Sequence, residues 1–239
     1  MSELQRGITN FVWEREDGKI VKYFTNYRWN MMFLNIFKFF FMDFRTQGLK
    51  DGIERELEAK NKLSEIGVKV PLITEKEDDY IVMEKLEGSV LEIFLENSKP
   101  CQCFEKGREK GLQLRKIHDN GFSLIDSRLS NSFVSGEDLF SLDHELFEKE
   151  SSNIQKELDL ISLQTSARFI DKTKYRMFMK GFSRGYGEDF KDNLWVRFFL
   201  TFFTGLWLGM FGRKSPEKIL INVENWFRDF YNFFELEKY

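Results

Sequence analysis

The stretch IHDNGFSLIDSRLSNSF, residues 117–133, decides how the rest of the chain is interpreted. It places Asp126 and Asn131 five positions apart, directly after a helical pattern that ends at Gly121. Read alone, this spacing also fits an ordinary turn whose short polar side chains bond to the backbone. Further along, FSLDHE adds Asp143 to the same region. The stretch is therefore either a polar turn or the floor of a phosphate-transfer site, and the remaining sequence has to decide.

Strand patterns dominate the first part of the chain. FVWERED (11–17) and KIVKYF (19–24) flank Asp17-Gly18, a favoured hairpin turn. KDGIERELEAKNKLSEIG (50–67) has the apolar spacing of a helix, and its final glycine followed by Pro71 predicts where that helix ends. YIVMEKLEG (80–88) has the pattern of a buried strand that leaves through a turn.

Helical patterns dominate the second part. We expect a helix over 105–121, two short strands within 131–145, and helices from residue 154 onward. Strands with one helix, followed mostly by helices, predict an α+β fold. We expect a small, mostly antiparallel N-lobe over residues 1–88 and a larger helical C-lobe over 89–239, with the boundary within 87–95.

Composition excludes several classes of function. At 239 residues the chain can bury a substantial core, and a net charge of −3 with interspersed acids and bases gives no basic surface for nucleic acid. Cys101 and Cys103 are too close together for the usual zinc spacing, and no second Cys/His pair completes a site. The first residues lack the apolar core of a signal peptide, so we expect a cytoplasmic protein.

Phenylalanine is unusually frequent, with 27 residues. Many lie in WNMMFLNIFKFFFMDF (29–44) and WVRFFLTFFTGLWLGMF (195–211). Lys38 and Arg197 interrupt these stretches, which argues against membrane-spanning helices. Two interpretations stay open: buried core helices, or a surface that contacts a membrane or an amphipathic substrate.

The chain also carries, in a consistent order, the polar groups that phosphoryl transfer from ATP requires. A strand lysine neutralises the phosphates, a helix glutamate holds that lysine, and a linker backbone bonds to adenine. A loop aspartate then orients the acceptor hydroxyl, and an asparagine and a second aspartate hold metal ions. The candidates for these roles are Lys22; Glu54, Glu56 or Glu58; Glu84 to Leu86; Asp126; Asn131; and Asp143.

On these residues the chain resembles the protein-kinase-like fold, and most of all the lipopolysaccharide core (Kdo and heptose) kinases. It is also similar to the RIO kinases and to the small atypical kinase of the KEOPS complex. The resemblance covers residues 7–159. An aromatic insert at about 25–50, which begins with a YR-like pair, favours the lipopolysaccharide branch. The matching stretches are KIVKYF, YR (27–28), EAKNKLSEIGVKVP (58–71), YIVMEKLEG, LRKIHDNG, DSRLSN and FSLDHE.

The resemblance implies how the nucleotide is bound. Glu58-Ala59 followed by GVKVP (67–71) fits the helix motif of these families, so Glu58 is predicted to pair with Lys22. Gly7, with the amides of residues 8–10, takes the place of a reduced phosphate-binding loop. Glu84 and Leu86 are predicted to contact the adenine through their backbone groups.

The resemblance also implies the catalytic roles. Asp126 corresponds to the catalytic base, and Arg128 is placed to neutralise the transferring phosphate. Asn131 and Asp143 correspond to metal ligands, and Glu145 is either a further ligand or a solvated side chain.

The sequence departs from these families at several points. Leu124-Ile125 stands where a His-Gly or His-Arg pair usually precedes the catalytic aspartate, and His118 is expected to have a structural role, bridging backbone groups. Asp159 either anchors the catalytic loop or lies at the surface.

These observations predict an enzyme that uses ATP and Mg²⁺. The expected reaction is phosphorylation of a sugar hydroxyl of a lipopolysaccharide core or another lipid-linked glycan. Such an acceptor would bring peripheral contact with the inner face of the cytoplasmic membrane. The alternatives are an atypical Ser/Thr protein kinase of the RIO or KEOPS type, with a protein acceptor, and a pseudokinase that binds nucleotide or a partner. No nucleic-acid partner is expected.

Overall fold

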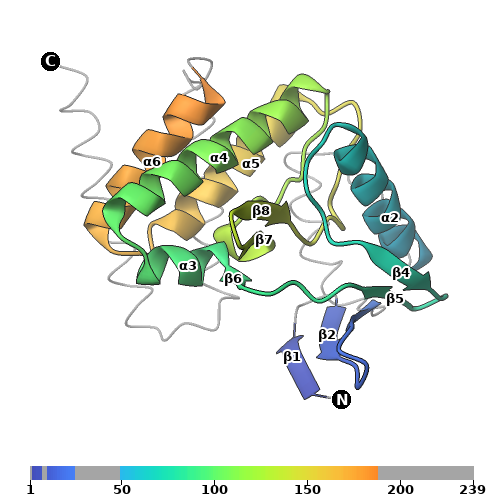
Figure 1. The fold of residues 1–239 in the computed structure, drawn as a ribbon. Coiled ribbons are helices and arrows are strands. Elements are labelled where there is room, and N and C mark those ends of the chain that lie inside the picture. The colour runs from blue at the N-terminus through green and yellow to red at the C-terminus, as the bar shows by residue number, and fades with distance from the viewer. Residues whose placement is uncertain (1, 7–9, 25–48, 188–239) are drawn as a thin grey trace, which may run out of the picture. The chain divides into compact units, whose positions relative to one another are not determined.

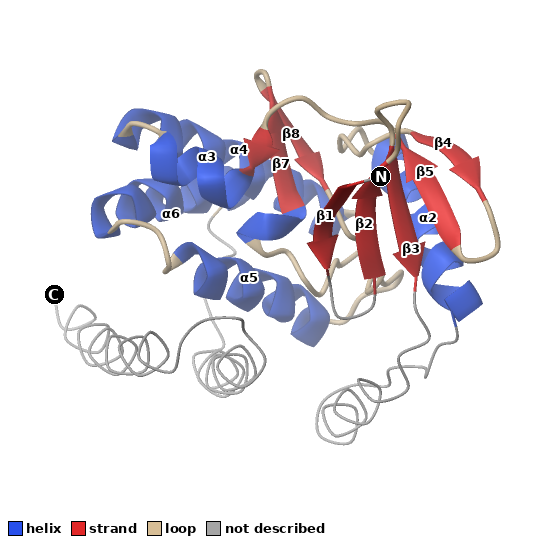
Figure 2. Ribbon diagram, turned by 90° about the horizontal axis from the view of Figure 1, so that it is seen from below, coloured by secondary structure: helices blue, strands red, loops and turns tan. Residues whose placement is uncertain are grey.

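The computed structural model describes residues 2–6, 10–24 and 49–187, which all belong to one compact unit, Met1–Lys191. Figures 1 and 2 show the strands of residues 2–83 beside the first described helix, and the remaining strands beside the later helices. Gly7 and the two aromatic stretches at 29–44 and 195–211 lie outside the described residues. Within the described residues, no helix is long and apolar enough to cross a membrane.

Among its described residues, the N-terminal part is an antiparallel sheet with one helix, as predicted. The five strands lie in the order β1 (Ser2–Arg6), β2 (Asn10–Glu14), β3 (Ile20–Phe24), β5 (Tyr80–Met83) and β4 (Ile73–Lys76), and each neighbouring pair is antiparallel. The turn after β2 contains Gly18 with a φ of 79°, which confirms the predicted Asp17-Gly18 hairpin. The register of β3 on β5 places Lys22 opposite Ile81, in the middle of the sheet.

Helix α2 (Leu49–Glu65) packs between two apolar clusters. Its Ile53 joins Phe24, Ile81 and Met83 beside the sheet. About two and three turns later, Ala59 and Leu63 belong to the larger cluster that continues into the helical part. Helical spacing puts these residues on one face, and any polar residue in phase with them is forced into the interior.

The second part contains a three-stranded sheet and four helices among the described residues. Strands β6 (Ser89–Val90), β7 (Ser132–Ser135) and β8 (Asp138–Ser141) pair in that order, with Gly136 in the turn between the last two. The helices are α3 (Leu91–Asn97), α4 (Pro100–Asp119), α5 (Asn153–Ala167) and α6 (Lys172–Tyr186). The predicted helix, the paired strands and, as far as residue 187, the later helices are therefore confirmed, and the fold class is α+β.

Sequence signals explain several helix ends. Pro100 begins α4, where its missing N–H costs nothing. Ser152 caps α5: its hydroxyl oxygen accepts a hydrogen bond from the Gln155 amide, and the Gln155 side-chain oxygen accepts one from the Ser152 amide. The Asp171 carboxylate accepts hydrogen bonds from the amides of Thr173 and Lys174 at the start of α6.

Helices α4 and α6 touch backbone to backbone through two pairs of glycines. Gly107 and Gly111 of α4 face the backbone of α6, and Gly181 and Gly185 of α6 face the backbone of α4. A Cβ atom at Gly181 would collide with the carbonyl oxygen of Phe104. Small residues four apart on both helices are what such a close approach requires.

We expect alanine to have opposite effects at two helical glycines. Gly181→Ala should lower the free energy of unfolding by about 2–4 kcal/mol, because α4 and α6 must separate to admit the methyl group. Gly52→Ala in α2 should raise it by up to about 1 kcal/mol, since its nearest neighbour is the Phe24 ring at 3.5 Å, an ordinary contact. Urea unfolding of both variants tests this, and equal effects would contradict the backbone contact.

A second prediction concerns Lys110, which is fully buried in α4. Its Nζ donates to Gln113 Oε1 at 3.1 Å, and burial lowers its pKa to about 8, although the charge of Asp159 opposes the fall. Below pH 8 the buried ammonium lowers the free energy of unfolding by its full amount. This cost declines as the pH rises from 8 toward 10.5. Lys110→Met should thus raise the free energy of unfolding by about 1–3 kcal/mol at neutral pH.

Urea unfolding at pH 7 and about pH 9.5 measures this difference. The advantage of Lys110→Met should shrink at the higher pH. A stability difference that does not change between the two values would show that Lys110 is not a buried cation.

Candidate active site

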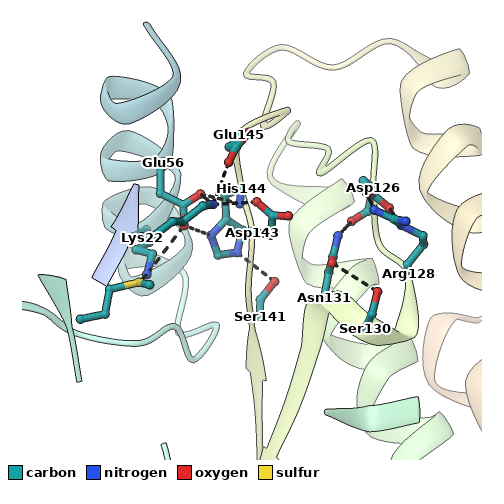
Figure 3. A network of polar contacts seen from close by, with 12 residues as sticks. Lys22, Glu56, Asp126, Arg128, Ser130, Asn131, Ser141, Asp143, His144 and Glu145 are labelled. Atoms are coloured by element: carbon teal, nitrogen blue, oxygen red, sulfur yellow. Dashed lines mark hydrogen bonds and ion pairs between the residues drawn. The ribbon is translucent and has the colours of Figure 1, made fainter. Parts of the chain in front are cut away.

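Lys22 is the centre of a buried cluster of charges. It lies in β3, is 3% exposed, and its Nζ is 2.7 Å from Asp143 Oδ1, 3.0 Å from Glu145 Oε1 and 3.1 Å from Glu56 Oε2. The carboxylates come from α2 and from the segment that follows β8, so three distant parts of the chain meet on one ammonium group. Figure 3 shows these side chains converging.

The helix partner of Lys22 is Glu56, and the prediction of Glu58 is wrong. Glu56 is 1% exposed, whereas Glu58 forms an ion pair with Lys149 near the surface. The reason is helical phase, since Glu56 follows Ile53 by three positions and precedes Leu63 by seven, and both of those residues are buried. The apolar periodicity of the helix already contained this signal, but the motif comparison pointed two residues further along.

The segment after β8 is held against α2 by His144. The backbone amide of His144 donates to Glu56 Oε2 at 2.7 Å, and its Nε2 lies 3.0 Å from Ser141 Oγ. Burial lowers the pKa of His144, so the imidazole is neutral at pH 7 although it lies 3.4 Å from Glu56 Oε1. Asp143, the preceding residue, has a φ of 58°, a left-handed conformation that aspartate tolerates better than most residues.

Mutual electrostatics fix the charge of these groups. Burial alone would lower the pKa of Lys22, but Asp143, Glu145 and Glu56 raise it well above its ordinary value. Burial alone would raise the pKa of Glu56, but Lys22, His144 and Lys60 lower it well below its usual range. For Asp143, desolvation together with the charges of Glu145 and Glu56 outweighs Lys22 and raises the pKa to about 6. Lys22 and Glu56 are therefore a buried ion pair.

Lys60 is a member of this cluster that the sequence analysis missed. It is 4% exposed, one helical turn after Glu56, and its Nζ lies 3.7 Å from Glu56 Oε1, 3.3 Å from the Pro71 carbonyl oxygen and 2.8 Å from Met83 Sδ. Burial lowers its pKa to about 8. Only its phase with Ile53 and Leu63 could have indicated that this lysine points inward.

Asp126, Arg128 and Asn131 form a second group. The Arg128 guanidinium holds both oxygens of Asp126, with Nε 2.7 Å from Oδ1 and Nη2 2.5 Å from Oδ2. Ser162 of α5 donates to Asp126 Oδ1 at 3.0 Å. Asn131 Nδ2 donates to the Asp126 carbonyl oxygen at 3.0 Å, which directs the amide oxygen of Asn131 away from that carbonyl. The predicted residues of this loop are thus brought together.

A backbone hydrogen bond connects the two groups. The amide of Leu142 donates to the carbonyl oxygen of Asn131 at 2.9 Å, so the residue before Asp143 is tied to the predicted catalytic loop. Figure 3 shows the two groups on either side of β7 and β8. The structure therefore brings the five predicted residues Lys22, Asp126, Arg128, Asn131 and Asp143 into two groups that are joined by a backbone hydrogen bond.

Buried contacts from the helices hold the loop that carries Asp126. Asp159 is fully buried, and its Oδ2 accepts a hydrogen bond from the Leu124 amide at 2.8 Å and lies 3.1 Å from His118 Nε2. His118 Nδ1 is 2.7 Å from the Tyr186 hydroxyl, so His118 joins side chains of two helices rather than the backbone groups that we expected it to bridge. Asp159 anchors the loop and does not lie at the surface.

The linker between the two sheets offers backbone groups for a ligand. The Glu84 amide donates to the Leu72 carbonyl oxygen, and the Glu84 side chain accepts a hydrogen bond from the Leu72 amide at 2.8 Å. Among the described residues, no hydrogen bond uses the Glu84 carbonyl oxygen or the Leu86 amide. This pairing matches the donor and acceptor pattern of an adenine edge.

The charge of the cluster fits a divalent cation, and the donor set fits Mg²⁺. Three carboxylates surround Lys22, so its single positive charge leaves an excess of negative charge at Asp143 and Glu145. The Asp143 side chain is 38% exposed and hence accessible. Mg²⁺ prefers one or two carboxylates, completed by phosphate and water oxygens, and Asn131 adds an amide oxygen nearby. The described residues contain no group of three His, Cys, Asp or Glu residues that could hold a metal by itself.

Comparison with known proteins gives one sequence relative and a structural likeness. No known family model matches the chain. The KEOPS complex subunit Bud32 of Pyrococcus abyssi is 30% identical over 149 residues, which is 59% of this chain. The alignment spans 66% of the length of that relative.

Among solved structures, WaaP in complex with acyl carrier protein matches with a TM-score of 0.53 and 18% identity, over 93% of this chain and 89% of that chain. At this identity the likeness concerns the fold alone. It agrees with the antiparallel sheet, helix α2 packed beside it and the helical part described above. The chain has the protein-kinase-like fold.

Proposed function

We propose that the protein is an ATP-dependent phosphotransferase. The observation that carries the proposal is the buried pair of Lys22 and Glu56, which lies beside Asp143 and is joined through the Leu142 amide to the loop of Asp126 and Asn131. A structural ion pair needs no accessible carboxylate and no loop aspartate held in a fixed orientation next to it. Phosphoryl transfer needs all of these groups.

The nucleotide is bound between the linker and Lys22. Adenine bonds to the Glu84 carbonyl oxygen and the Leu86 amide, and the phosphates draw the Lys22 ammonium. Glu56 keeps this ammonium in place, because the His144 amide and Lys60 hold Glu56 from other directions. Asp143, Asn131 and Glu145 would hold Mg²⁺, which would neutralise charge on the phosphate oxygens.

Asp126 accepts the proton of the acceptor hydroxyl, or orients that hydroxyl for attack. Arg128 is well placed to contact the transferring phosphate, because its guanidinium already lies on the Asp126 carboxylate and its side chain is 31% exposed. A phosphate that draws Arg128 away would free an edge of Asp126 for the acceptor. Nucleotide binding and release of the base would then be coupled.

The acceptor that we propose is a sugar hydroxyl of a lipopolysaccharide core or another lipid-linked glycan, reached at the inner face of the cytoplasmic membrane. The aromatic insert at about 25–50 and its YR-like pair support this choice. Bud32 is the sequence relative, and its 30% identity supports a second candidate, an atypical Ser/Thr protein kinase. Incubation with γ-labelled ATP separates the two candidates: label should enter a lipid-extractable glycan and not protein. Label in protein alone would favour the second.

Replacing the two site aspartates should affect different steps. Asp126→Asn should lower the rate of ADP release from Mg²⁺-ATP about 100-fold or more, with little change in nucleotide binding. Asp143→Asn should abolish the dependence of nucleotide binding on Mg²⁺, because it removes a metal-binding carboxylate. Steady-state kinetics and calorimetric titration with and without Mg²⁺ measure both effects. Full activity of Asp126→Asn would refute the assigned base, and wild-type protein that transfers phosphate from ATP to neither water, lipid-extractable glycan nor protein would refute the enzyme.

The two neighbouring glutamates of α2 give a matched test of the Lys22 pair. Glu56→Gln should lower the free energy of unfolding by about 2–4 kcal/mol and weaken ATP binding, because it leaves Lys22 and Lys60 without their shared buried anion. Glu58→Gln should change stability by less than about 1 kcal/mol, since Glu58 and Lys149 are 40% and 49% exposed. Thermal unfolding and ATP titration compare the variants, and a larger effect at Glu58 would contradict the observed pairing.

A further inference from the structure

One face of α5 carries three buried polar residues, Asp159, Ser162 and Ser166. Their spacings of three and four positions place them on the same side of the helix. Asp159 is fully buried, and each serine is 8% exposed. Polar side chains at this depth need hydrogen-bond partners, so this stripe is either a cost to folding or a binding surface for another segment.

The partner of the stripe is the loop that carries Asp126. Asp159 accepts a hydrogen bond from the Leu124 amide at 2.8 Å, and its own carbonyl oxygen accepts one from Ser127 Oγ at 2.5 Å. Ser166 Oγ accepts from the Leu129 amide at 3.0 Å. Thus both ends of the loop segment 124–129 are bound to the same helix.

Ser162 differs from the other two because it contacts a side chain. Its hydroxyl donates to Asp126 Oδ1 at 3.0 Å, since a carboxylate can only accept. Arg128 is the other described partner of this carboxylate, and it approaches from within the loop. Of the two partners, Ser162 is the more buried and stands on a helix, whereas Arg128 is partly exposed and has a long, flexible side chain.

We propose that Ser162 is a positioning residue for the phosphotransfer, which fixes the rotation of the Asp126 carboxylate while Arg128 contacts the transferring phosphate. The inference rests on the proposed function. When Arg128 turns toward phosphate, the hydroxyl of Ser162 keeps Oδ1 in place and leaves Oδ2 directed at the acceptor. No histidine supports Asp126 from the two preceding positions, because these are Leu124 and Ile125. The Ser162 hydroxyl supports the carboxylate instead.

The test compares two substitutions of equal shape. Ser162→Thr retains the hydroxyl, and Ser162→Val replaces it with a methyl group. ADP release from Mg²⁺-ATP, with water as the acceptor, gives kcat and KM. The Val variant should have a kcat about 10-fold below that of the Thr variant, because a hydrogen bond to a charged group is lost. The KM for ATP and the melting temperature of the two should agree within about twofold and a few degrees, respectively.

Thr165→Val is the control for loss of a hydroxyl on the same helix, because Thr165 has no hydrogen bond to the loop in the part of the chain that the structure describes. Its kcat should equal that of the wild type. Ser162→Ala provides a smaller substitution if the branched side chains prevent folding, and it should show the same selective loss of kcat.

Each outcome has a definite meaning. Equal kcat values for the Thr and Val variants would overturn the positioning role while leaving the proposed function intact. A Val variant that loses ATP binding and thermal stability along with kcat would assign Ser162 to the fold alone and also overturn it. Wild-type protein that releases no ADP with water, with a lipid extract or with protein as the acceptor would refute the phosphotransfer itself, whatever the variants do.

Discussion

The buried ammonium of Lys22 is the constraint on which the site depends. An uncompensated charge at this depth would cost several kcal/mol, so the chain has to bring carboxylates to it. Glu56 comes from α2, and Asp143 and Glu145 come from the segment after β8. Because these partners stand on separate elements, satisfying one lysine fixes the helix against the sheet and the segment against both. The arrangement that stabilises the fold is then the same one that gathers groups for chemistry.

The loop that carries Asp126 contains a residue with a strained backbone conformation. Ile125 has a φ of 63°, which is unfavourable for a β-branched residue and costs on the order of 1–3 kcal/mol. Hydrogen bonds on either side, from Leu124 to Asp159 and from Leu129 to Ser166, hold the backbone in this conformation. In this conformation the Asp126 carbonyl oxygen accepts from Asn131, and the Asp126 carboxylate contacts Arg128 and Ser162.

The sequence was informative where a pattern is local. Apolar spacing predicted α2, the Asp17-Gly18 turn predicted the first hairpin, and two short strands were expected within 131–145; the order of the polar residues indicated one site. The distinction between Glu56 and Glu58 required the phase of α2 against the core, which a linear motif does not weigh. Lys60 and Ser162 were missed because an inward lysine or serine has the same local sequence as an outward one. Which of them finds a partner depends on segments far away in the chain.

The glycine contact between α4 and α6 limits which substitutions these helices can accept during evolution. Where two backbones touch, there is no room for a side chain. Substitution is therefore disfavoured at four positions: Gly107, Gly111, Gly181 and Gly185. The loop with Asp126 begins just after α4, and the tyrosine that ends α6 holds His118. In distant relatives whose catalytic motifs are no longer recognisable, two pairs of glycines, each four residues apart, would therefore locate the two helices. The loop that corresponds to the one with Asp126 could then be placed from these helices.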